Sequence, residues 1–173
     1  MVVSKELNKY LKELSKEELI KEINKLYGKF KFVKEYYASE LGTDNGELLK
    51  GCKVRIAKLI LKTGRNIKPD IASANKVIRE FAKVSVHQVD VIDLMLYKVE
   101  LIVEFLDQWG YSHFTGVENS IANTYPDILN LIYKNRLKKT FTKRCKQVEV
   151  KAGNYGLISE TLITDEDDED SDS

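Results

Sequence analysis

The stretch from residue 86 to residue 109, VHQVDVIDLMLYKVELIVEFLDQW, is the longest uninterrupted helical pattern in the chain. Its apolar residues recur at intervals of three, four and seven, which is the period of one helix face. That face comprises Ile92, Met95, Leu96, Val99, Ile102, Val103 and Leu106. Because Leu94, Leu101 and Phe105 widen it further, we expect several neighbouring helices to pack around this segment. Gly110 is expected to end the helix.

Length and composition indicate one helical domain. A chain of 173 residues can bury a sizeable core, and fractions of 43% hydrophobic and 32% charged residues are those of an ordinary globular protein. With two prolines and nine glycines, the composition favours helices. The opening MVVSKELNK has no apolar h-region, and charges interrupt the central segment throughout, so we expect a cytoplasmic protein without a membrane contact.

The same periodicity predicts six further helices. They are residues 4–14, residues 15–41, a third helix between Gly46 and Gly64, a fourth entered at Pro69, a sixth over 117–133 and a seventh over 137–150.

Three details refine these helices. Ser15 and Glu18 form a capping-box pattern at the start of the second helix. That helix is expected to continue through Gly28, because an interior Gly costs only about 1 kcal/mol relative to Ala. Pro126 should kink or break the sixth helix, since proline lacks the amide hydrogen.

The predicted fold is therefore all-α. Short connections favour antiparallel neighbours, so we expect a compact array of about seven helices in antiparallel hairpins around the central helix (86–109). Residues 1–164 would form one domain. Residues 165–173 hold seven acids and no base, and are expected to be a disordered acidic tail. The rest of the chain then holds 28 bases against 20 acids.

Several segments resemble a family of small, uncharacterised bacterial helical proteins, classified as a domain of unknown function. They are LNKYLKELSKEELIKEINKLYGKFKFVKEYY (7–37), DLMLYKVELIVEF (93–105), NSIANTYPDILNLI (119–132), KRC (143–145) and GNYGLISETL (153–162). The resemblance covers most of residues 5–162 and implies membership without implying an activity. The chain differs at Gly42–Gly51, at Pro126 and in the acidic extension after Thr164.

One side of the predicted central helix carries a band of acidic residues. The band comprises Asp90, Asp93, Glu100, Glu104 and Asp107, with Tyr97 among them. Each like-charge pair at this spacing costs about a few tenths of a kcal/mol, so repulsion alone does not require a ligand. The band could be a solvated or lysine-paired face, a docking surface for a basic partner, or a carboxylate site. We take Asp93, Tyr97, Glu100 and Glu104 as candidate binding residues.

A second charged surface is the basic helix over residues 134–151. Its bases are Lys134, Arg136, Lys138, Lys139, Lys143, Arg144, Lys146 and Lys151. Such a density can contact phosphates, but the bases surround the helix without a recognised reading motif. Lys138, Lys139, Lys143 and Arg144 are the candidate binding residues here.

The remaining reactive residues show no catalytic or metal-binding spacing. Cys52 and Cys145 are isolated and are expected to be reduced thiols packed on helix faces. His87 and His113 lie in different segments, outside any Glu-x-x-His motif. Glycine-rich phosphate loops and nucleophile elbows are missing as well. We therefore expect no metal, no cofactor and no catalytic residue.

Three functional hypotheses follow from these surfaces. The first is a cytosolic helical scaffold or adaptor that binds another macromolecule, most simply a protein, without catalysis. The second is a nucleic-acid-associated protein that uses the basic helix 134–151 and is modulated by the acidic tail. The third is an enzyme that uses the acidic band. The sequence names no partner and no pathway.

Overall fold

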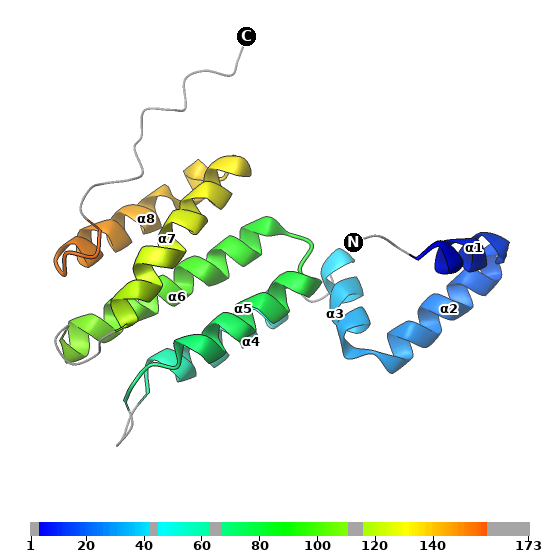
Figure 1. Cartoon of the computed structure of the whole chain (residues 1–173), viewed down its shortest axis with the longest axis horizontal. Coiled ribbons are helices and arrows are strands. Elements are labelled where there is room, and N and C mark those ends of the chain that lie inside the picture. Colours follow the sequence, from blue (N-terminus) through cyan, green and yellow to red (C-terminus); the bar gives the residue numbers. More distant parts are fainter. Residues whose placement is uncertain (1–3, 42–44, 63–66, 111–115, 159–173) are drawn as a thin grey trace, which may run out of the picture.

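The computed structural model describes residues 4–41, 45–62, 67–110 and 116–158. Within them the chain forms eight helices and no strand, so the predicted all-α fold is confirmed (Figure 1). The helices are α1 (Lys5–Glu13), α2 (Lys16–Lys29), α3 (Lys31–Glu40), α4 (Asn45–Ile60), α5 (Ile71–Val84), α6 (Gln88–Trp109), α7 (Val117–Lys134) and α8 (Lys138–Gly153).

Helix α6 is the predicted central helix, and it packs against α4, α5, α7 and α8. Its residues Ile92, Leu96, Val99 and Ile102 are fully buried, and Met95 packs against the core from a partly buried position. The helix ends where expected, because Gly110 adopts a φ of 79° and donates its amide hydrogen to Leu106. The apolar residues around most of the circumference of α6 are therefore buried against neighbouring helices.

Helices α4 and α5 pack against each other and against α6. Pro69 was expected in the first turn of α5, but the helix begins two residues later. Asp70 is the N-cap residue, and its carboxylate accepts a hydrogen bond of 3.0 Å from the amide of Ser73. This bond satisfies an amide that the first turn leaves free and lowers the pKa of Asp70.

The prediction of a continuous or slightly bent helix over residues 15–41 is wrong, because α2 ends at Lys29 and the extended Phe30 separates it from α3. The backbone of Phe30 is extended (φ −116°, ψ 121°). Its amide donates the last hydrogen bond of α2 to the carbonyl of Leu26, and its own carbonyl accepts hydrogen bonds from the amides of Val33 and Lys34. The break redirects α3 onto α4 and α5. Gly28 stays inside α2, so the predicted tolerance of that glycine is confirmed, as is the capping box of Ser15.

The sequence predicted a kink or a break at Pro126, and a break is not seen, since α7 continues through this residue to Lys134. Pro126 and Ala122, four residues earlier, are both exposed. The carbonyl that loses its helical partner therefore faces solvent, where water can satisfy it. On the opposite side, Tyr125 is buried and its hydroxyl donates to Glu149 over 2.8 Å, joining α7 to α8.

Both cysteines are free and buried, as the sequence predicted. Burial raises the pKa of the Cys145 thiol to about 11, so the thiol is protonated at neutral pH. Further along, Leu157 and Ile158 pack against the core. The predicted acidic tail, residues 165–173, lies outside the described residues.

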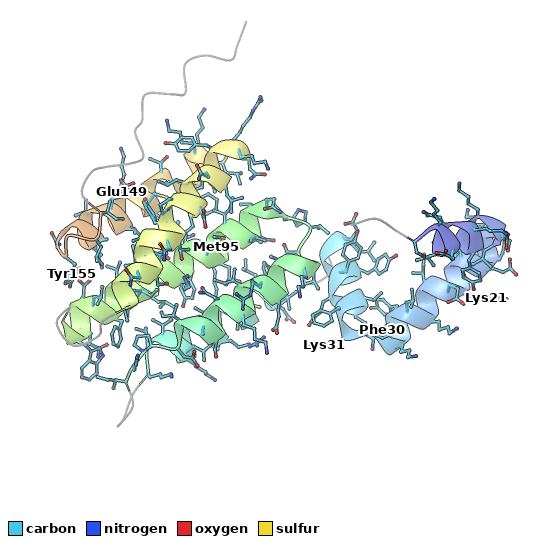
Figure 2. The ribbon with its side chains drawn as sticks, viewed as in Figure 1. Lys21, Phe30, Lys31, Met95, Glu149 and Tyr155 are labelled. Atoms are coloured by element: carbon cyan, nitrogen blue, oxygen red, sulfur yellow. The ribbon has the colours of Figure 1, made fainter. Side chains whose placement is uncertain are left out.

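Two regions differ sharply in burial. The buried core consists of residues from α4 to α8, which we call the helical body. Residues 4–41, with α1 to α3, form an N-terminal arm that extends from one end of this body (Figure 1). Figure 2 places Lys21 far out on the arm and Phe30 and Lys31 at its bend. No residue of α1 or α2 is buried.

Candidate functional site

The acidic band of α6 and the basic helix α8 face each other. Arg144 donates Nε to Oε1 of Glu100 over 2.7 Å and Nη2 to Oε2 over 2.8 Å, and its Nη1 bonds Asp93. Lys53 of α4 reaches the other oxygen of Asp93 over 2.6 Å. The hydrogen bonds that Arg144 donates to Glu100 raise the pKa of Arg144, which stays charged. Four helix-borne charges therefore form one network joining α4, α6 and α8.

Two further contacts, both with Asp107, lie at the other end of the interface between α6 and α8. The hydroxyl of Tyr155 donates to Oδ1 of Asp107 over 2.6 Å, and Lys151 lies 3.4 Å from Oδ2. The hydrogen bond to Asp107 raises the pKa of Tyr155. Both contacts are exposed, so they contribute little stability beyond fixing the end of α8.

The remaining members of the predicted acidic site do not converge on a ligand position. Tyr97 is half-buried, with the ammonium of Lys53 5.4 Å from its ring centre, and burial raises the pKa of Tyr97. Glu104 is exposed at a shallow groove of about 270 Å³ between α6 and α8. Burial raises the pKa of Asp90. The band is mainly a face paired with bases of the body, the first of the interpretations given above.

The four basic residues predicted to bind a ligand on α8 differ in their exposure and contacts. Arg144 is held by carboxylates, and Lys138 is buried, with its ammonium 5.9 Å from the ring centre of Tyr133. Lys139 and Lys143 are exposed. A phosphate-binding surface on α8 would therefore begin with two of the four predicted bases rather than all four.

The structure also contains a buried lysine that the sequence reasoning missed. Lys98 of α6 is 1% exposed, and its ammonium donates to Oδ1 of Asn75 over 2.8 Å and to Oγ1 of Thr124 over 3.0 Å. Burial lowers the pKa of Lys98 to about 8. A signal existed, because the positions three and four residues away on either side, including Leu94 and Ile102, are all apolar.

An apolar groove lies on the N-terminal arm. It has a volume of about 520 Å³ and runs between α2, α3 and the end of α5. Seven apolar or aromatic residues and one lysine line it: Ile23, Leu26, Phe32, Val33, Tyr36, Tyr37, Lys83 and Val84. We call this the arm groove. Its dimensions and lining suit apolar side chains of another polypeptide.

The two walls of the arm groove are held by aromatic contacts. The rings of Tyr27 and Tyr37 are 6.4 Å apart between α2 and α3, and those of Tyr36 and Tyr37 meet edge to face at 5.4 Å. These contacts set the angle that the break at Phe30 permits. The apolar spacing of residues 15–41 carries no signal that this side of the helices would remain uncovered.

The described residues were also compared with the requirements of a metal site and of a membrane-spanning helix. Among them, no cluster of three or more His, Cys, Asp or Glu side chains could hold a metal ion. Nor does any described helix have the length and apolarity that crossing a membrane requires.

Comparison with known proteins gives a family but no activity. No curated protein matches the chain, and no solved structure matches it. The model of a protein family, described as a family of unknown function (DUF6155), matches residues 2–158. That match spans nearly the whole chain and agrees with the resemblance found in the sequence, so the protein belongs to the DUF6155 family.

Proposed function

We propose that this chain is a cytosolic helical scaffold that binds another protein through its N-terminal arm and performs no chemistry. The observation that carries the proposal is the arm groove of about 520 Å³, lined almost entirely by apolar and aromatic side chains. Recognition by such a groove commonly places an amphipathic helix against it, with apolar side chains one helical turn apart.

The distribution of exposed apolar residues supports the same proposal. Among the described residues, eleven large hydrophobic side chains in residues 4–41 are between 37% and 70% exposed, against four in the whole helical body. Scattered exposed apolar residues are normal, but a contiguous set marks an interaction surface. In the acidic band that offered a catalytic alternative, Asp93 pairs with Lys53 and Arg144, and Glu100 pairs with Arg144.

Affinity capture from the source cell tests this proposal. The bait is the full-length chain, compared with Ile23→Glu plus Leu26→Glu on the groove wall. Both positions are exposed, and Glu keeps the helix propensity of α2, so the variant should fold. The matched control is Val150→Glu, an exposed apolar residue on α8.

The expected result is a protein recovered by the wild type and by Val150→Glu but lost from the groove variant. An untagged copy of this chain counts as such a protein. Recovery of the same proteins by all three baits would overturn the proposal, because the arm would then contribute nothing to binding.

A further inference from the structure

The N-terminal arm carries two amphipathic helices, α1 and α2, whose apolar sides are not covered by their own chain. In α1 the exposed apolar residues are Leu7, Tyr10 and Leu11, and in α2 they are Ile20, Ile23, Leu26 and Tyr27. Each set falls on one side of its helix. Helices of 9 and 14 residues are marginal in water when isolated, and amphipathic ones owe their stability to packing of the apolar side. Burial of these apolar sides against another surface would therefore stabilise α1 and α2.

The exposed apolar area of the arm matches that of a stable dimer. Eleven large hydrophobic side chains of the arm are between 37% and 70% exposed, and together they leave on the order of 900 Å² of surface in water. The largest patch on a typical monomer is about 300–600 Å². A standard interface buries about 800 Å² on each partner. The arm alone thus supplies one side of an interface of ordinary size.

The charges of the arm favour a second copy over a strongly charged partner. Residues 4–41 hold nine lysines and seven glutamates, so the arm is close to neutral, and acids are interspersed with bases except in the run of lysines from Lys25 to Lys34. Two arms can therefore meet without net repulsion. A segment that binds anionic membranes or nucleic acid would instead carry an excess of bases on its polar side.

The shape of the arm also suits pairing with itself. The two-residue link Leu14–Ser15 joins α1 to α2, and the Tyr10 hydroxyl lies 3.5 Å from a carboxylate oxygen of Glu22. Two copies bring together four such amphipathic helices, and a four-helix bundle buries the apolar side of each one. The arm stands clear of the helical body at one end, where a second copy can approach (Figure 1).

We infer that two copies of the chain pair through their N-terminal arms, with α1 and α2 of one copy covering α2 and the arm groove of the other. The pairing is isologous, so each copy both fills and offers a groove. This inference rests on the proposed function and names the partner at the same surface. Ile23 and Leu26 belong to both the apolar side of α2 and the groove wall, so the proposed pairing places them at the centre of the interface.

Light scattering coupled to gel filtration, over a wide range of concentrations, measures the mass of the full-length chain. The wild type and Val150→Glu should have twice the chain mass of 19.9 kDa. Ile23→Glu plus Leu26→Glu should fall to the single chain mass, a twofold drop, while the helical body keeps its cooperative unfolding. Ile23→Lys plus Leu26→Lys should behave in the same way.

Mixing the Glu and Lys variants provides the decisive comparison. Opposite charges then face each other across the pair, so the mixture should recover the double mass although neither variant does so alone. A monomeric wild type, a monomeric mixture, or a dimer that the arm substitutions do not change would each overturn the inference. So would a monomer that binds vesicles containing phosphatidylserine through the arm.

The two proposals fail in different ways. A monomeric wild type whose capture of a different protein is abolished by Ile23→Glu plus Leu26→Glu would reject the pairing of copies and keep the protein-binding arm. Substitutions that change neither the mass nor the captured proteins would reject both.

Discussion

Replacing Arg144 by methionine tests whether the acidic band of α6 is structural. Methionine keeps a long apolar side chain in place but removes the guanidinium that bonds Glu100 and Asp93. After the change, Asp93 keeps its contact with Lys53 of α4. Glu100 loses both of its hydrogen bonds from Arg144, so the loss falls mainly on that carboxylate.

The expected cost follows from how deeply the network is buried. The side chains of Arg144 and Glu100 are each 30% exposed and that of Asp93 is 18% exposed. Exposed ion pairs contribute about 0–1 kcal/mol, whereas removing one partner of a buried pair costs about 3–5 kcal/mol. The Arg144 network lies between these limits. We therefore expect Arg144→Met to lower the free energy of unfolding by about 2 kcal/mol.

Urea unfolding, followed by far-ultraviolet circular dichroism, measures this loss. Lys143→Met is the matched control, because Lys143 is the neighbouring base on α8 and is exposed. It should change the free energy of unfolding by no more than about 0.5 kcal/mol. The free energy of unfolding that Arg144→Lys loses should lie between the losses of Arg144→Met and Lys143→Met. An ammonium keeps the charge but cannot donate two parallel hydrogen bonds to Glu100.

A double-mutant cycle with Glu100→Gln assigns the loss to the contact itself. The coupling energy between Arg144 and Glu100 should be about 1 kcal/mol or more. If Arg144→Met costs less than about 0.5 kcal/mol and shows no coupling, the reasoning is refuted. The carboxylates of α6 would then contribute nothing to packing, and a ligand site on the acidic band would again be the better explanation.

The remaining predictions concern the buried lysine and the acidic tail. Because burial lowers the pKa of Lys98 from 10.5 to about 8, the unfolded chain binds more protons between these values and stability should rise with pH. Relative to Lys98→Met, the wild type should gain about 2 kcal/mol in free energy of unfolding between pH 7 and pH 10, and a difference independent of pH would contradict this. Under the nucleic-acid alternative, deleting residues 165–173 should increase the affinity for DNA or RNA at low salt, as measured by fluorescence anisotropy. Equally negligible binding by the full and truncated chains would reject that alternative.

The sequence predicted the helices well because their signal is local. The apolar period of residues 86–109 and the capping box at Ser15 and Glu18 depend on neighbours within one or two turns. The break at Phe30 could not be predicted in this way. Nothing at that position opposes a helix, and the chain turns there because α3 packs on α4 and α5.

The candidate site was predicted in part for the same reason. The acidic band and the basic helix were both visible in the sequence, but their mutual pairing depends on α6 and α8 lying side by side. Arg144 could have faced solvent with equal local propensity. Lys98 was missed because a lysine on an apolar face has no local mark of its distant partners, Asn75 and Thr124.

The sequence by itself determined the helical class, the central helix and the amphipathic sides of α1 and α2, since these follow from residue spacing along one chain. Only the tertiary structure decided which of those sides would be covered. The apolar sides of α4 to α8 pack against one another in the helical body, whereas those of the N-terminal arm remain exposed. Spacing shows that a helix has an apolar side, but burial depends on segments that are distant in the chain.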